Sequence, residues 1–277
     1  MIREVNTVCF KTIRHQDRGF TLIELLVVIA VIALLVMILI PSLRAARCQT
    51  QKVICISNLR EIGTAIHSYA VNHNDRIPYG PKGLPVMGGN FYTVEGNVTS
   101  LISLMNGRPV GLGLLLDGYI DDQPLVLFCP GADQPSEADK QLSRVGSRQA
   151  QGDYYYRHGS VDRLVGEGDT SHIRLSNLGK NSRGIQISAL AMDVQFLAHP
   201  SLESFSVVTR TSHRQKFSNI LFADNQVVTH DNTFVPPDDD PSYIPDETEE
   251  PFIIDVGISP YDALEKILAV FEKADKL

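Results

Sequence analysis

The most constraining feature of the sequence is an almost uninterrupted apolar run from Phe20 to Ile40, close to the N-terminus. As an α-helix, these residues would be about 31 Å long, which is close to the roughly 30 Å hydrocarbon thickness of a bilayer. The run therefore predicts a single transmembrane helix. Basic residues flank it on both sides in equal number, so the positive-inside rule does not set its orientation.

Glu24 is the one ionisable residue inside this run. A carboxylate costs about 2.5–3.5 kcal/mol at the bilayer centre and less near the edge, where Glu24 lies. Cleavage after Gly19 would create a free amine on Phe20, one helical turn away. That amine and the carboxylate could neutralise each other within one subunit or between neighbours. The alternative is an uncut membrane anchor.

The segment Gly19-Phe20-Thr21-Leu22-Ile23-Glu24 resembles the cleavage and methylation motif of type IV prepilins and type II secretion pseudopilins. The resemblance implies that a prepilin peptidase cuts after Gly19 on the cytoplasmic side and methylates the amine of Phe20. It also implies that Glu24 pairs with the terminal amine of a neighbouring subunit during assembly. Pro41 falls where this family often has a proline, as a helix kink or as the end of the apolar segment.

Three further segments resemble pilin-like proteins of planctomycete- and verrucomicrobia-type bacteria, which are similar to the type II secretion pseudopilin G class. They are Cys55–Gly63, Gly111–Ile120 and Phe128–Pro130. Many of these proteins also carry a processing-associated motif that begins with His and ends in Asp-Gly. Here His213 is followed at a different spacing by Asp224-Asn225, so the resemblance implies a local strand and turn without a processing role.

Beyond Pro41 the helix is expected to continue to about Asn74. Leu59, Ile62, Ile66 and Tyr69 recur at helical spacing and form one apolar face. Further along, two apolar runs flank Asp224-Asn225, which predicts a hairpin with a two-residue turn because both residues tolerate positive φ. The chain is therefore expected to have an α+β, pilin-like fold, with a long N-terminal hydrophobic helix packed on a small antiparallel sheet domain.

The segment from Ser259 onward predicts a C-terminal amphipathic helix, with Pro260 at its first position. This helix could dock on the head or bind a partner helix, and docking is the default expectation. The predicted segments are the leader (1–19), the transmembrane and assembly helix (20–40), its amphipathic continuation (41–74), the extracytoplasmic head (75–235), an acidic Pro-bearing linker (236–258) and the C-terminal helix (259–277).

The cysteines show no metal or redox pattern. Cys48 and Cys55 lie about 10 Å apart along one predicted helix, which is too far for a disulfide within that helix. Cys9 would be lost with the leader. Three cysteines remain, so at most one internal disulfide can form; Cys55–Cys129 is possible, and unpaired thiols are equally compatible with the sequence.

No catalytic or metal site is predicted, and no cofactor is expected. No zinc template matches the spacings among the six candidate ligands, which are His199, His213, His230, Asp193, Asp224 and Asp231. The chain is therefore not expected to be an enzyme. The net charge of −7 argues against nucleic acid as a partner. The acidic stretch 236–241 is expected to be a solvated loop, with a calcium site as the alternative.

These features favour a structural subunit of a type IV pilus-like or type II secretion pseudopilus-like assembly, processed by prepilin peptidase after Gly19. Its expected partners are that peptidase, other pilin-like subunits and the inner membrane. The N-terminus is expected in the cytoplasm and the C-terminal domain in the periplasm or outside the cell. The alternative is a membrane-anchored display or binding module that does not polymerise.

Overall fold

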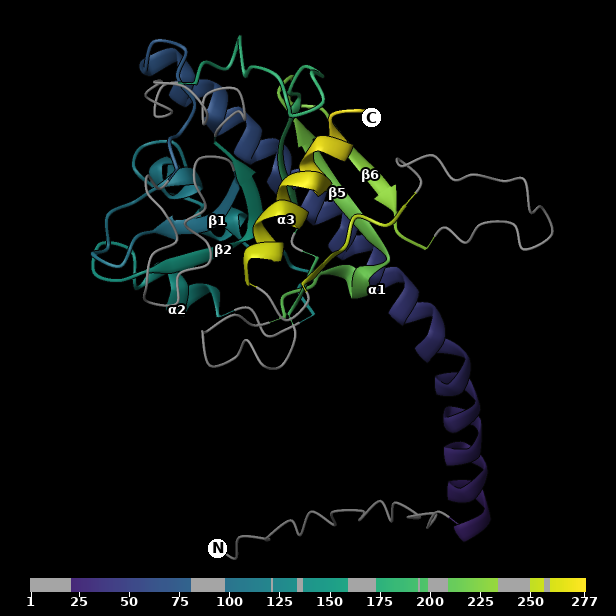
Figure 1. Ribbon diagram of the computed structural model, residues 1–277. Coiled ribbons are helices and arrows are strands. Elements are labelled where there is room, and N and C mark those ends of the chain that lie inside the picture. Colours follow the sequence, from purple (N-terminus) through teal and green to yellow (C-terminus); the bar gives the residue numbers. More distant parts are fainter. Residues whose placement is uncertain are drawn as a thin grey trace, which may run out of the picture. The chain divides into compact units, whose positions relative to one another are not determined.

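The computed structural model describes residues 21–80, 98–120, 122–133, 137–158, 173–193, 195–198, 209–233, 250–256 and 260–277. The chain falls into two units, Met1–Arg47 and Cys48–Leu277. In chain order the elements are α1 (Leu22–Asn72), β1 (Val98–Ser103), the 3-10 helices η1 (Gly111–Leu116) and η2 (Pro124–Leu127), α2 (Ala138–Leu142), β2 (Ala150–Arg157), β3 (Ala189–Asp193), β4 (Phe196–Ala198), the 3-10 turn η6 (His213–Gln215), β5 (Phe217–Phe222), β6 (Val227–Asp231), β7 (Ile254–Val256) and α3 (Pro260–Ala274) (Figure 1).

The helix α1 has 51 residues, and Pro41 lies inside it. Proline lacks a backbone N–H, so one hydrogen bond of the helical ladder is missing at this position. The helix ends at Asn72, two residues before the predicted end at Asn74. Asn74 and Asp75 have φ values of 56° and 66°. This left-handed conformation ends a helix, and Asn and Asp tolerate it better than most residues do.

The main sheet is antiparallel and has five strands in the order β1-β2-β3-β5-β6. Its strands are rich in aromatic and β-branched residues, which favour extended backbone. A second, two-stranded sheet pairs β4 with β7 in parallel, with Phe196 opposite Ile254. The long helix with an antiparallel sheet domain confirms the predicted α+β, pilin-like fold.

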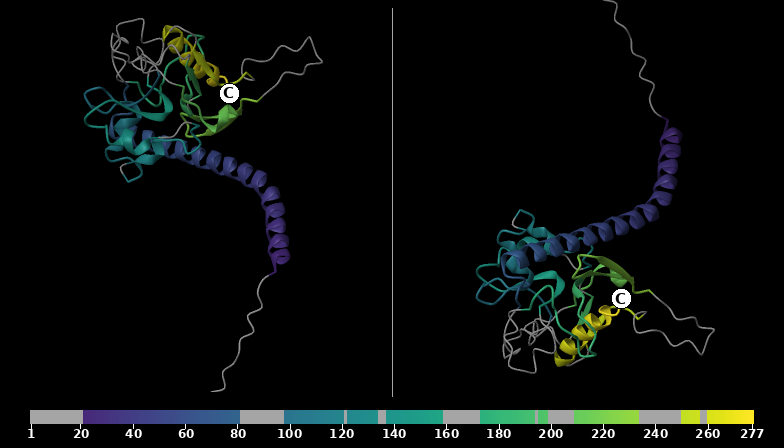
Figure 2. Two further views of the ribbon diagram at one scale, coloured as in Figure 1. Left: turned by 90° about the horizontal axis from the view of Figure 1, so that it is seen from below. Right: turned by 90° about the horizontal axis from the view of Figure 1, so that it is seen from above.

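Three consecutive tyrosines in β2 show that both faces of the sheet are covered. Tyr154, Tyr155 and Tyr156 are each at most 2% exposed. Because successive strand residues point to opposite faces, Tyr154 and Tyr156 join the core that contains α1, and Tyr155 joins the core that contains α3. Figure 2 shows α3 and the later part of α1 on opposite sides of the strands.

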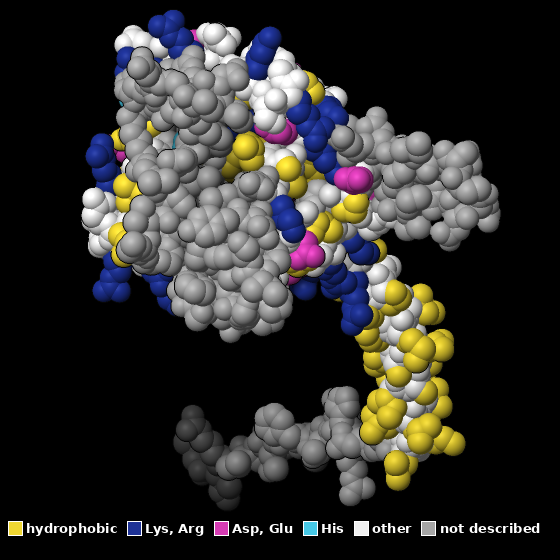
Figure 3. Space-filling model, in the orientation of Figure 1, with side chains coloured by type: hydrophobic (Ala, Val, Ile, Leu, Met, Phe, Trp, Pro, Cys, Tyr) yellow, Lys and Arg dark blue, Asp and Glu magenta, His cyan; other side chains and the backbone are white. Residues whose placement is uncertain are grey.

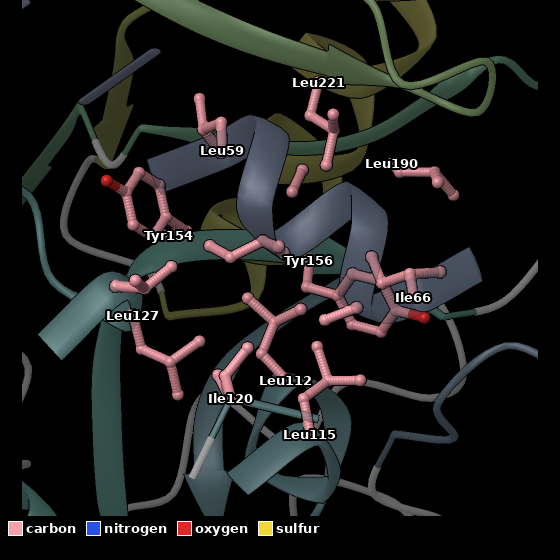
Figure 4. Close-up of a cluster of buried hydrophobic side chains, with 14 of the residues drawn as sticks. Leu59, Ile66, Leu112, Leu115, Ile120, Leu127, Tyr154, Tyr156, Leu190 and Leu221 are labelled. Carbon is pink, nitrogen blue, oxygen red and sulfur yellow. The ribbon is translucent and has the colours of Figure 1, made fainter. Parts of the chain in front are cut away.

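The core between α1 and the sheet is built on the predicted apolar stripe. Leu59, Ile62 and Ile66 of α1 are completely buried. They pack against side chains from the strands and from η1, including Leu112 and Leu221 (Figure 4). The stripe begins at Cys55 and ends with Tyr69 and Ala70, so the core contacts of α1 belong to its C-terminal part.

The β5–β6 hairpin is present, but its turn differs from the prediction. The Phe222 N–H donates to the Gln226 carbonyl at 2.8 Å, which leaves a three-residue loop, 223–225, instead of two residues. Asn225 alone in this loop has a positive φ, at 67°. A loop of this length usually places one residue in the left-handed region, and Asn is suited to it.

The predicted acidic linker, 236–258, is wrong in its C-terminal part. Residues 254–256 form β7, and Phe252 and Ile254 are at most 2% exposed. Their alternating apolar side chains enter the core beneath α3, which excludes a solvated linker at these positions. The stretch 236–241, with its alternative calcium site, lies outside the described residues.

The C-terminal helix α3 docks on the sheet, in agreement with the default expectation. Its Ile267 and Phe271 are buried against Tyr155, Met192 and Ile220.

A buried ion pair, which was not predicted from the sequence, links the residue after α3, Asp275, to Arg157 of β2. The Arg157 guanidinium donates to both Asp275 oxygens at 2.8 and 3.0 Å, and both side chains are at most 1% exposed. Further donors to Asp275 are the Asn181 side chain and the backbone N–H groups of Ser188 and Ala189, at 3.0–3.1 Å.

The replacement Asp275→Asn tests this ion pair, because it keeps the side-chain shape and removes the charge opposite Arg157. An uncompensated buried charge is strongly unfavourable, so we expect the free energy of unfolding to fall by about 3–5 kcal/mol. The measurement is urea denaturation of the full chain in detergent, followed by tyrosine fluorescence. The control is Glu137→Gln, which breaks the exposed pair with Lys140 (2.7 Å) and should cost at most about 1 kcal/mol. Equal losses in the two variants would contradict this account.

Candidate functional site

The first turn of α1 is closed by a reciprocal pair of hydrogen bonds between Thr21 and Glu24. The Glu24 carboxylate accepts from the Thr21 N–H at 2.9 Å and from its hydroxyl at 2.8 Å. In return, the Thr21 hydroxyl oxygen accepts from the Glu24 N–H at 3.3 Å. This arrangement is a capping box, and its Thr-x-x-Glu signature is visible in the sequence, although it was not among the predictions.

Gly19 and Phe20, the residues of the predicted cleavage site, lie outside the described residues. Thr21 is the first residue that the structure describes. The processing roles of Gly19 and Phe20, the assembly role of Glu24 and the role of Pro41 therefore stay predictions. The structure adds that Glu24 sits in the first helical turn, directly after this site.

The N-terminal part of α1 exposes apolar side chains on all of its sides. Every residue from Leu22 to Arg47 is exposed, with Leu22 at 86% and Met37 at 72%. Figure 3 shows apolar side chains projecting from the face and edges of this helix that are in view. A helix that is apolar all round needs an apolar environment, supplied by lipid or by other helices. By length and composition, α1 can cross a membrane once.

A second group of functional interest is a buried cluster in the head, formed by side chains of Cys55, Cys129, Asp193 and His213. Their sulfur, oxygen and nitrogen atoms all lie within 4.8 Å of one another. The two sulfurs are 3.5 Å apart, and His213 Nε2 lies 3.3 Å from Cys129 Sγ and 3.3 Å from Asp193 Oδ2. The Cys55 thiol donates to Asp193 Oδ2 at 3.5 Å. This donor set could hold a metal ion.

Each member of the cluster comes from a different segment. Cys55 begins the buried stripe of α1, and Cys129 follows η2. Asp193 ends β3, and His213 begins η6. The four residues are far apart in the sequence, with Cys55 and Cys129 separated by 74 positions and Cys55 and Asp193 by 138. Zinc templates in sequences rely on short spacings, so only the folded chain reveals this grouping.

His213 is presented by an unusual backbone turn. His213, Arg214 and Gln215 have φ values of 52°, 54° and 60°, and none of them is glycine. Left-handed backbone costs roughly 1–2 kcal/mol for each such residue. Asp133 holds the turn, because its carboxylate accepts from the Arg214 N–H at 2.9 and 3.0 Å and from the Thr211 hydroxyl at 2.8 Å.

Burial and proximity change the acid–base properties of the cluster. Burial raises the pKa of the Cys55 thiol well above its ordinary value, and Cys129 and Asp193 raise it further. Burial lowers the pKa of His213, but the hydrogen bonds and charges of Asp193 and Cys55 outweigh this effect and raise it to about 9. In the absence of a cation, the Cys55 thiol would therefore be protonated and His213 would be an imidazolium.

The structure brings together the two cysteines of the candidate disulfide, Cys55 and Cys129, as free thiols. A disulfide requires sulfurs about 2.05 Å apart, and these lie at 3.5 Å. Their covalent pairing stays a prediction. Of the six His and Asp residues considered in the sequence, the cluster includes His213 and Asp193; His199 lies outside the described residues.

Thiol accessibility tests the placement of the cysteines. Cys48 is half-buried on α1, whereas Cys55 and Cys129 are at most 2% exposed. We expect iodoacetamide to label Cys48 in the native protein and to label Cys55 and Cys129 more than about tenfold more slowly, since a thiol buried in the core is inert. Peptide mass spectrometry before and after denaturation in reductant measures this ratio. Similar native labelling of all three residues would refute the buried placement.

Comparison with known proteins places the N-terminal segment in a recognised group. A family model described as the prokaryotic N-terminal methylation motif matches residues 14–40. The competence protein ComGC of Halalkalibacterium halodurans is 30% identical over 64 residues, which is 23% of this chain and 62% of that protein. The type IV wide pilus major component PilA4 of Thermus thermophilus is 42% identical over 60 residues, covering 22% of this chain and 46% of that protein.

The ComG operon protein 3 homolog of Bacillus licheniformis is 36% identical over 63 residues, covering 23% of this chain and 65% of that protein. The chain thus spans between about half and two thirds of the length of these curated relatives. No solved structure matches. The N-terminal segment of this chain is therefore similar to pilin components, and the long helix with the antiparallel sheet domain agrees with a pilin-like fold.

Proposed function

We propose that this chain is a structural subunit of a type IV pilus-like or type II secretion pseudopilus-like assembly, cut after Gly19 by prepilin peptidase. The observation that carries the proposal is a methylation motif that leads directly into an exposed apolar helix with Glu24 in its first turn. The printed name of the Thermus thermophilus relative, a pilus major component, supports a pilus-like structural role.

The helix geometry supports the proposed role of Glu24 in assembly. Its carboxylate is hydrogen-bonded by Thr21, but the hydroxyl and amide of Thr21 carry no net charge. The negative charge is therefore not neutralised within this turn. In an apolar environment a charge without a counter-ion costs several kcal/mol, so a methylated amine on Phe20 of a neighbouring subunit would be a favourable partner.

The same proposal assigns the location and the partners. The leader lies in the cytoplasm, the apolar part of α1 crosses the inner membrane, and the head lies in the periplasm or outside the cell. The partners are prepilin peptidase and other pilin-like subunits, which pack their apolar helices side by side. No catalytic activity and no nucleic-acid binding are part of this role.

The state of the N-terminus tests the processing step. Mass spectrometry of the protein from membranes that contain prepilin peptidase should find a mature chain that begins with methylated Phe20. Membranes from a strain without the peptidase should yield the full leader, because no other enzyme is expected to cut between Gly19 and Phe20. A chain that still begins with Met1 when the peptidase is present would overturn the processing step.

Assembly is tested by separating the charge of Glu24 from its capping role. Glu24→Gln keeps a side chain that can complete a capping box and removes the charge. We expect the amount of this protein in sheared filaments to fall at least roughly tenfold, while its amount in the membrane stays normal. Thr21→Ala is the matched control: it removes the cap, which costs about 1 kcal/mol at the start of the helix, and keeps the charge, so incorporation should persist. Immunoblots of the sheared and membrane fractions measure the amount of each variant in filaments and in the membrane.

The display-module alternative predicts the opposite pattern. If Glu24→Gln left filament incorporation unchanged, while substitutions on the surface of the head abolished function, the chain would be a membrane-anchored binding module. Loss of incorporation in Thr21→Ala as well as in Glu24→Gln would show that assembly also depends on the capped shape of the first turn.

A further inference from the structure

The four side chains of the buried cluster converge on one point from four separate segments of the head. We propose that this cluster is a structural zinc site, whose ligands are Cys55 Sγ, Cys129 Sγ, Asp193 Oδ2 and His213 Nε2. The site is independent of the N-terminal assembly motif, and it goes beyond the proposed function.

Four of the six distances between the ligand atoms are close to the edges of a tetrahedron around zinc. Zinc binds sulfur at about 2.3 Å and imidazole nitrogen or carboxylate oxygen at about 2.0–2.2 Å, so the edges of the tetrahedron are about 3.8 Å between two sulfurs, about 3.5 Å from sulfur to nitrogen or oxygen, and about 3.4 Å from nitrogen to oxygen. The observed edges are 3.5 Å for the two sulfurs, 3.3 Å from Cys129 to His213, 3.5 Å from Cys55 to Asp193 and 3.3 Å from His213 to Asp193. These four edges are within a few tenths of an ångström of those of a zinc tetrahedron, and the other two, from Cys55 to His213 and from Cys129 to Asp193, are no longer than 4.8 Å.

The donor atoms select the metal. Two thiolates, an imidazole and a carboxylate form a mixed soft and borderline set, which suits zinc in tetrahedral geometry. Calcium and magnesium prefer oxygen ligands in larger number and would leave the sulfurs unused. Because the four ligand residues are all buried, no coordination position faces solvent. A closed site of this kind stabilises a fold and does not bind substrate.

Groups around the ligands are arranged to support anionic donors. The Asn219 backbone N–H donates to Asp193 Oδ1 at 3.2 Å, and its side-chain amide donates to Asp193 Oδ2 at 2.8 Å. The Gly131 N–H donates to Cys129 Sγ at 3.4 Å, and the Tyr154 hydroxyl lies 3.4 Å from Cys55 Sγ. Such outer contacts orient ligands and stabilise their charged forms.

The backbone around His213 is shaped for a close approach. A Cβ at Gly131 would lie 2.3 Å from His213 Nδ1, so only glycine leaves room for the imidazole ring. The Phe217 ring stacks on the His213 ring, with ring centroids 4.4 Å apart. Strained backbone persists where the surroundings over-determine it, and it concentrates at functional sites. The left-handed turn at 213–215 therefore orients the His213 side chain toward the other three ligands.

Zinc content of the full chain, purified from membranes in detergent with reductant and without chelator, tests the proposal. Elemental mass spectrometry should find about one zinc ion per chain in the wild type and in the control Cys48→Ser, whose side chain lies outside the cluster. Cys129→Ser should retain less than about a tenth of that amount. Zinc at the wild-type level in Cys129→Ser would overturn the assignment.

Two measurements on the unsubstituted protein keep the test independent of how the variant folds. Cobalt(II) loaded in place of zinc should show thiolate-to-cobalt absorption in the near ultraviolet, and cobalt binding without that absorption would overturn the thiolate ligands. Intact mass of protein purified without reductant, with free thiols blocked after denaturation, separates zinc from a disulfide. Two reactive thiols at Cys55 and Cys129 support the zinc site, whereas a zinc-free chain with these cysteines linked, and therefore lacking two hydrogens, overturns it.

Discussion

Burial of one stripe of α1 against the sheet is the contact on which the head depends. Leu59, Ile62 and Ile66 are fully covered, and each such side chain contributes roughly 1.5–3 kcal/mol. Before Cys48 the same helix has no such stripe, since its apolar side chains are exposed on all sides. One continuous helix thus presents an all-round apolar surface in one part and a one-sided surface in the other. The change in hydrophobic pattern along α1 suits the first part to lipid or neighbouring helices and the second to a protein core.

The sheet is buried on both faces, and this explains why the C-terminal segment must return to it. Tyr155 points away from α1 and needs a second cover, which α3 supplies through Ile267 and Phe271. The buried pair of Arg157 and Asp275 links the end of that cover to β2. An ion pair in this position adds specificity, because an alternative docking of α3 would leave the Arg157 charge buried without a partner.

The proposed zinc site would join four separate segments of the head. It connects the start of the buried stripe of α1, at Cys55, to the loop after η2, the end of β3 and the strained turn at 213–215. Metal binding would be favourable enough to offset the cost of that turn, and it would fix these segments to α1. Under the two proposals, the methylation motif and the cluster would serve separate purposes within one chain: the first for assembly, the second for the shape of the head.

The sequence by itself determined the apolar helix, its amphipathic continuation, the β5–β6 strands and the C-terminal helix, because each depends on a local period or on a local start signal. It also contained the Thr21–Glu24 capping box, another local pattern. Tertiary structure alone decided the three-residue turn at 223–225, the strand at 254–256, the Arg157–Asp275 pair and the meeting of Cys55 with Asp193 and His213. These features depend on contacts between positions far apart in the chain. Periodicity and spacing along the sequence do not specify which distant side chains will contact one another in the core.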